Sequence, residues 1–258
     1  PPCAVMPGSL VVLQLGPSRV SSHLSPMASI LLRRLAMADT RFGKLLRWLH
    51  RAVLNFTLPT PRLLFRPVLY AFLTLRQVYY FIYRVFFCEP LFKASCSKVG
   101  QRVRCGPFVQ WVQGAGRIEV GDDVAIHGKA SFTFGSRYSD DPVISIGPHS
   151  HIGHNCAFVA GRSITIHEYC QMAPDVVVFD VSGHPSDPAA RERGEPAPDE
   201  SVKPVVIERN VWIGRRAMIY PGVTVGENSV IGANSVVMNS VPPNSLVMGN
   251  PARRVGTV

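Results

Sequence analysis

Residues 207 to 237 read IERNVW IGRRAM IYPGVT VGENSV IGANSV V, and every group of six begins with Ile or Val. The fifth position of each group holds a second, smaller residue: Val211, Ala217, Val223, Ser229 and Ser235. A period of six is neither the alternation of a β-strand nor the 3.6-residue period of a helix. We interpret it as a coil with flat sides, in which one apolar residue per six points inward and a small residue beside it allows the chain to turn. Three such sides close a triangular turn, and stacked turns bury a core that no single repeat could bury alone.

The same period continues toward the N-terminus with one interruption. Ile146, Ile152 and Phe158 keep the six-residue spacing, and after a two-residue insertion it resumes at Ile166, Met172 and Val178. Between Val178 and Val205 the repeat is broken by more than twenty residues. The sequence therefore predicts a loop, residues 179–204, that leaves the coil, and loops on a rigid scaffold often carry function.

Four motifs in and after this loop point to one family. They are Ser182-Gly183-His184-Pro185, Asn210-Val211-Trp212-Ile213-Gly214, Pro221-Gly222-Val223-Thr224-Val225-Gly226 and Gly249-Asn250-Pro251-Ala252. In this order they resemble the hexapeptide-repeat acyltransferases, most closely the maltose and galactoside O-acetyltransferases and the O-acetyltransferases of polysaccharide biosynthesis. The resemblance implies an all-β fold, a left-handed parallel β-helix with an N-terminal basic, apolar helical segment and a short C-terminal tail. It also implies a homotrimer.

For function, the resemblance implies transfer of an acetyl group from acetyl-CoA to a hydroxyl of a sugar or glycan-type acceptor, with His184 as general base. An imidazole suits this step, and such proton transfer contributes typically about 10²- to 10⁴-fold to the rate. An acidic residue could orient the imidazole and stabilise its charged form. Glu195, in the same loop, and Asp180, four residues before the histidine, are both candidates. The acceptor could be a lipid-linked sugar, a surface polysaccharide unit or an antibiotic-like hydroxyl compound.

The resemblance also places acetyl-CoA in the groove between two neighbouring β-helices. Gly214, Arg215 and Ala233 would then offer backbone contacts to the pantetheine arm, and Trp212 would form a wall of the groove or of the acceptor pocket. Arg253 or Arg254 would meet the phosphates, for which a guanidinium is geometrically suited. Asn239 departs from the family pattern, because many relatives carry Lys or Arg at that position.

Two other classes of function fit parts of the sequence. His149, His151 and His154 resemble the zinc ligands of γ-class carbonic anhydrases, since imidazole is a good zinc ligand. Neighbours about six apart lie on different sides of the coil, however, so a third ligand would have to come from His127 or from another chain. Acetyl transfer needs no metal. A non-catalytic trimeric scaffold at a membrane surface is the other alternative.

Charge divides the chain into two parts. Residues 1–104 contain 15 of the 27 Lys and Arg residues but only the acids Asp39 and Glu89, whereas residues 105–258 contain 12 basic and 15 acidic residues. Nucleic-acid binding has little support, because the basic part has no recognition motif and the repeat part is slightly acidic. Val68 to Phe87 are mostly apolar, but Arg76 and Arg84 make a membrane span unattractive. Such a segment predicts a helix lying on an anionic membrane or packed against the trimer.

These observations divide the chain into three expected parts. Residues 1–27 receive no function and could be a leader or an artefact, residues 28–95 form the basic, apolar helical segment, and residues 96–258 form the β-helix. The six cysteines lack the spacing of a disulfide framework or a metal site, so we expect reduced thiols. The expected location is cytoplasmic, with a peripheral contact at the inner face of the membrane through residues 28–95.

Overall fold

The computed structural model describes residues 40–258, and the chain divides into two compact units, Pro1–Val68 and Leu69–Val258. The leader 1–27 and the start of the predicted helical segment, residues 28–39, lie outside the described residues. Helix α2 (Arg41–Leu54) begins after Thr40, whose hydroxyl accepts a 3.1 Å hydrogen bond from the Gly43 NH. The predicted helical segment 28–95 is interrupted after Leu54, because Pro59 and Pro61 follow in a non-helical connection.

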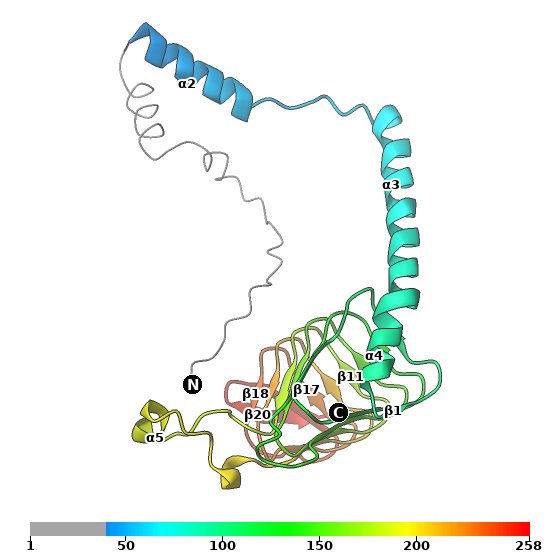
Figure 1. Cartoon of the computed structure of the whole chain (residues 1–258), viewed down its shortest axis with the longest axis vertical. Coiled ribbons are helices and arrows are strands. Elements are labelled where there is room, and N and C mark those ends of the chain that lie inside the picture. The colour runs from blue at the N-terminus through cyan, green and yellow to red at the C-terminus, as the bar shows by residue number, and fades with distance from the viewer. Residues whose placement is uncertain (1–39) are drawn as a thin grey trace. The chain divides into compact units, whose positions relative to one another are not determined.

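The second helical region is α3 (Arg62–Tyr83), which continues through the π-helical turn η1 (Arg84–Cys88) into α4 (Glu89–Ser95). The predicted apolar run thus lies in α3 and η1. Between Thr40 and Val258, no helix is long and apolar enough to cross a membrane. Helix α4 closes one end of the coil stack (Figure 1), where the buried Phe92 ring lies 5.6 Å from the ring of Phe132.

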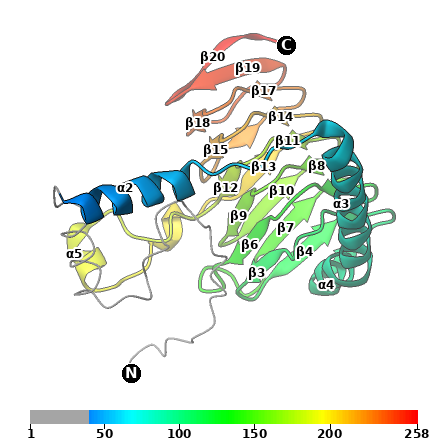
Figure 2. The same cartoon turned by 90° about the horizontal axis from the view of Figure 1, so that it is seen from above.

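The rest of the chain is a left-handed parallel β-helix, as predicted. Every third strand joins the same sheet, so three sheets form the sides of the coil (Figure 2). The first sheet contains β1 (Lys98–Val99), β4 (Arg117–Val120), β7 (Val143–Ile146), β10 (Ser163–Ile166), β13 (Val205–Ile207) and β16 (Thr224–Val225). The second contains β2 (Arg104–Cys105), β5 (Ala125–Ile126), β8 (His151–Ile152), β11 (Gln171–Met172), β14 (Trp212–Ile213), β17 (Val230–Ile231), β19 (Ser245–Gly249) and β20 (Ala252–Thr257). The third contains β3 (Trp111–Gln113), β6 (Ser131–Phe134), β9 (Ala157–Ala160), β12 (Val177–Phe179), β15 (Met218–Ile219) and β18 (Val236–Val237).

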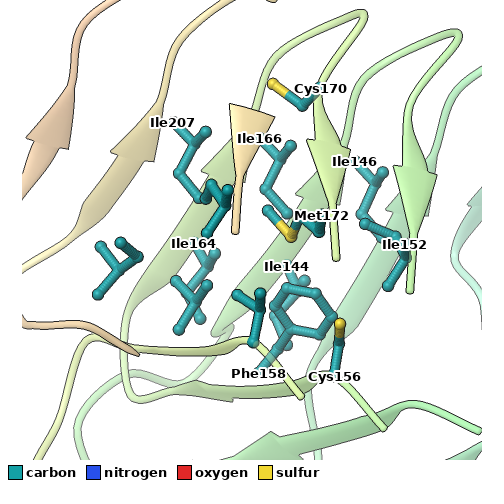
Figure 3. Packing of buried hydrophobic residues seen from close by; sticks show 14 of the residues in the cluster. Ile144, Ile146, Ile152, Cys156, Phe158, Ile164, Ile166, Cys170, Met172 and Ile207 are labelled. Carbon is teal, nitrogen blue, oxygen red and sulfur yellow. The ribbon is translucent and has the colours of Figure 1, made fainter. Parts of the chain in front are cut away.

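The hexapeptide positions form the core, as their period predicts. The first residues of the six groups between Ile207 and Val237 are at most 1% exposed, and so are the smaller residues four positions later. Figure 3 shows the same arrangement in earlier coils, where Ile146, Ile166 and Ile207 follow one another along the stack and Met172 lies beside Ile152. At the far end, the expected C-terminal tail is the ordered strand β20, which pairs antiparallel with β19.

One corner of the coil repeats an unusual backbone conformation. Between the first and second sheets, each coil places a non-glycine residue at a φ between 54° and 63°: Arg102, Asp123, His149, Tyr169, Asn210, Asn228 and Asn244. Asn and Asp tolerate this left-handed conformation better than most residues. The last three also form a ladder, in which the Asn210 amide donates to Asn228 at 2.9 Å and the Asn228 amide donates to Asn244 at 3.1 Å.

The ladder allows a test that separates backbone conformation from side-chain bonding. Asn228→Ala and Asn228→Gly both remove the amide bonds, but only Gly adopts a φ of 58° without strain. We expect the Ala variant to be less stable than the Gly variant by about 1–2 kcal/mol, measured by chemical unfolding. Equal stability of the two variants would contradict the importance of the left-handed corner.

Candidate active site

The histidine loop leaves the coil after β12 and returns at β13, and Figure 1 shows it projecting away from the coil stack. It contains the short helix α5 (Pro188–Glu192) and the 3-10 turn η2 (Asp199–Ser201). Asp187 caps α5 by accepting hydrogen bonds from the NH groups of Ala189 and Ala190. Arg191 donates to the carbonyls of Pro185 and Ser186 at 2.9 and 2.6 Å, so its guanidinium holds the chain directly after His184.

His184 lies on the wall of an open hollow of about 470 Å³ formed mainly by this loop. Glu195 lines the same hollow, together with Ser182, Asp187, Asp199 and Arg137 from outside the loop. His184 is exposed, and its backbone carbonyl accepts a 3.2 Å hydrogen bond from the Ser182 hydroxyl. An exposed imidazole beside a hollow is accessible to a substrate hydroxyl, which a general base requires.

Glu195 shares the hollow with His184 but forms its ion pair with another residue. The Glu195 carboxylate lies 2.6 Å from Nε of Arg193, and its side chain is 49% exposed. Half-exposed ion pairs of this kind contribute little to stability, so the carboxylate can exchange partners at small cost. Glu195 therefore remains a candidate for orienting the imidazole.

Asp180 has a different environment from the one expected for a solvated loop carboxylate. Its side chain is fully buried, and its oxygens accept backbone NH bonds from Gly161, Arg162 and Ser163 at 2.5 to 2.7 Å. Burial raises the pKa of Asp180, and the three NH donors act in the opposite direction by favouring the charged form. These bonds join the base of the histidine loop to the preceding coil. The structure thus gives Asp180 a structural role in place of the predicted contact with His184.

The predicted pantetheine-binding residues lie at a corner of the second sheet. Trp212, in β14, is 55% exposed, and Arg215 and Ala233 are exposed at turns of successive coils. Gly214 is buried, and its NH donates to the Ile231 carbonyl at 2.7 Å, so this NH is not available to a ligand. A Cβ at Gly214 would lie 2.6 Å from the backbone nitrogen of Ala233, which explains why glycine is needed there.

The predicted phosphate-binding arginines lie at the C-terminal end of the coil stack. Arg253 and Arg254 are exposed on β20, where they lie in register with Met248 and Val247 of β19. Asn239 is exposed in the turn after β18. The side chain of Arg215 is held by Asp175, at 3.0 Å, and the pKa of Asp175 is lowered by hydrogen bonds from Asn155 and then from Arg215.

The clustered histidines do not converge on one point. His127 Nε2 lies 3.0 Å from His151 Nδ1, whereas His149 stacks on Tyr169 and His154 packs against Phe108. The pKa of His151 is lowered, first by burial and then by the nearby His127 and Arg104. Across residues 40–258, no three His, Cys, Asp or Glu side chains are grouped so as to hold a metal ion.

Comparison with known proteins finds a hexapeptide-repeat profile and relatives among acetyltransferases. The profile described as bacterial transferase hexapeptide (six repeats) matches residues 204–239. Over 134 residues the chain is 37% identical to galactoside O-acetyltransferase of Escherichia coli (strain K12), a match that covers 52% of this chain and 61% of the relative. The chain is thus similar to members of the hexapeptide-repeat acyltransferase family.

Two further relatives define the extent of the likeness. Nodulation protein L of Rhizobium meliloti (strain 1021) is 42% identical over 110 residues, which cover 43% of this chain and 57% of the relative. A mutant of AntD, an N-acyltransferase from Bacillus cereus solved with dTDP and coenzyme A, has a TM-score of 0.53 at 22% identity. That match covers 66% of this chain and 87% of AntD and supports the fold alone. The chain spans about half to three fifths of the length of the curated relatives it matches.

The sequence did not predict a second hollow, which has a volume of about 340 Å³. Trp111, Lys129 and Asn155 are among the residues that line it, and the Lys129 ammonium lies 5.9 Å from the centre of the Trp111 ring. The available signal was Trp111 itself, a large aromatic residue at an outward position of a strand. The residues come from three different coils, so their spacing in sequence does not reveal the hollow.

The base of the histidine loop can be tested through Asp180→Asn. The substitution keeps the side-chain shape but turns one acceptor into a donor that faces backbone NH groups. We expect a loss of about 1–3 kcal/mol in the free energy of unfolding, measured by chemical denaturation. Asp199→Asn, at an exposed position of the same loop, is the matched control and should change stability by less than about 0.5 kcal/mol.

Proposed function

We propose that the chain is an acetyl-CoA-dependent O-acetyltransferase that acts on a hydroxyl of a sugar or glycan-type acceptor. The observation that carries this proposal is His184, exposed beside the loop hollow in a chain 37% identical to galactoside O-acetyltransferase of Escherichia coli (strain K12). We also propose that the protein lies in the cytoplasm, at the inner face of a membrane.

The proposed reaction needs one proton to move twice. Neutral His184 takes the proton from the acceptor hydroxyl as the hydroxyl oxygen attacks the thioester carbonyl of acetyl-CoA. The tetrahedral intermediate collapses to the acetyl ester, the carbon–sulfur bond breaks, and the imidazolium returns the proton to the departing thiolate. Glu195 would orient the ring and stabilise its positive charge after exchanging Arg193 for His184.

The proposed acetyl-CoA site uses the exposed residues at the second-sheet corner and the C-terminal end. Trp212 would present an apolar wall to the pantetheine arm, and Arg215 and Ala233 are exposed at turns of successive coils, whereas Gly214 contributes close coil packing. Arg253 and Arg254 are suited to bind the phosphates of acetyl-CoA. Asn239 offers them only a neutral amide, at a position where many relatives carry Lys or Arg. Because His184 and these residues lie on separate, exposed elements, we propose that a homotrimer brings them together across a groove between chains.

The central experiment compares the wild-type chain with His184→Ala in acceptor-dependent release of CoA from acetyl-CoA, using a panel of sugars and nucleotide-sugars. We expect the variant to lose about 10²- to 10⁴-fold in rate. His167→Ala, at another exposed histidine, should retain full activity. Both variants are first sized by light scattering. Activity unchanged in His184→Ala would exclude this histidine as the base, and absence of release and of acetyl-CoA binding in the wild type would favour a non-catalytic scaffold.

The phosphate contacts have their own test. The double variant Arg253→Ala/Arg254→Ala should raise KM for acetyl-CoA about tenfold or more with kcat nearly unchanged, because these arginines bind far from the reacting carbonyl. Arg209→Ala, an exposed arginine that stacks on Tyr169, is the control. A fall in kcat at constant KM would contradict phosphate binding and would indicate that the two arginines act in the chemical step.

A further inference from the structure

The helix α3 exposes an apolar surface that the described chain does not cover. None of its residues is buried, and its exposed side chains include Leu63, Leu64, Phe65, Val68, Leu69, Tyr70, Phe72, Leu75, Val78, Tyr79, Phe81 and Ile82. Leu75 is 70% exposed and Tyr79 is 60% exposed. Contiguous apolar surface on this scale marks a site of interaction with another apolar phase or protein.

The arginines of α3 gather on one side of the helix, where apolar residues such as Leu69 also lie. At about 100° per residue, Arg62, Arg66 and Arg76 fall within about 80° of one another around the helix axis. Apolar and aromatic side chains occupy most of the remaining circumference. A helix with a narrow cationic face and a broad apolar face lies flat at a lipid interface, because each face meets the phase that solvates it.

The composition of α3 and its flanking residues indicates that its partner is negatively charged. Residues 40–88 contain eight Lys and Arg residues and no Asp or Glu, and they hold 12 of the chain's 23 aromatic residues. The first acid after them, Glu89, already pairs with Arg84 at 2.9 Å and with Lys93 at 3.0 Å. Packing α3 against further copies of this segment would add positive charge without any compensating anion. An anionic lipid surface supplies both the apolar layer and the negative charge.

The preceding helix has the same design. In α2, the cations Arg41, Lys44, Arg47 and Arg51 lie along one side, and Phe42, Leu45, Trp48 and Leu49 are exposed. Tryptophan and tyrosine favour the boundary between lipid headgroups and acyl chains. Stable attachment to a membrane generally needs two signals, and α2 and α3 supply two such helices in succession.

We propose that α3 is a docking surface for an anionic lipid bilayer, on which the helix lies without crossing it, and that α2 makes a separate second contact of the same kind. The finding that no described helix is long and apolar enough to span a membrane agrees with this mode of contact. The inference rests on the membrane position included in the proposed function, and it does not depend on acetyl transfer.

The test is co-sedimentation of the full chain with vesicles of phosphatidylcholine alone or with one third phosphatidylserine. We expect binding to the anionic vesicles only, weakening as salt rises. Each arginine near an anionic surface contributes about a fivefold change in affinity, so Arg62→Gln/Arg66→Gln/Arg76→Gln should lower binding about a hundredfold. Arg104→Gln, an exposed arginine on β2, is the matched control and should bind as the wild type does.

A second variant, Leu75→Ser/Tyr79→Ser, tests the apolar face, and circular dichroism checks that the β-helix remains folded. Reduced vesicle binding by this variant supports docking. Equal binding of the wild-type chain to neutral and anionic vesicles would overturn the proposal. It would also be overturned if the wild-type chain bound no vesicles and the serine variant formed a smaller oligomer, which would indicate that α3 contacts other copies of the chain. CoA release with a water-soluble acceptor should be unchanged in all these variants. Vesicle binding by a wild-type chain that lacks transferase activity would refute the proposed reaction and leave the docking surface intact.

Discussion

Hydrogen bonds between successive coils are the constraint on which the rest of the structure depends. The β-strands that form the coil contain only two to six residues each, so none is stable alone, and backbone NH groups of one coil donate to carbonyls of the next. The close spacing of hydrogen-bonded coils leaves no room for a side chain at Gly214, and it places the inward residues of every coil in the same cross-section. A stack of this kind has two open ends. Here α4 closes one end with Phe92, and the β19–β20 pair lies at the other.

The sequence predicts the features that depend on period. Residues six apart take equivalent inward positions on successive sides of the coil, so the series from Ile207 to Val237 identifies the core correctly. The break in that series likewise predicts a loop, and the structure ends β12 at Phe179 and begins β13 at Val205. Neither inference requires knowledge of which coil lies next to which.

Contacts between coils are what the sequence could not provide. Asp180 finds its partners at residues 161–163, and His127 meets His151, because insertions change the number of residues in each turn. The same uncertainty concealed the hollow beside Trp111 and the use of the Gly214 NH within the stack. Residue type indicates a kind of chemistry, but coil length decides which side chains are neighbours. A carboxylate four positions before a histidine can therefore serve the backbone of another turn.

The basic helical part and the slightly acidic β-helix part of the chain differ in charge because they have different structural roles. The β-helix supplies its own core, so the exposed residues of α3 are free of any packing requirement within the described chain. Their apolar character therefore cannot be explained by the folding of the β-helix, and exposure of so many aromatic side chains to water carries a cost that only a partner removes. A partner that accepts arginines and aromatics together must offer anions beside an apolar layer. The acidic balance of residues 105–258 has the opposite sign, so on the proposed anionic surface this part of the chain would be repelled while residues 40–88 are attracted.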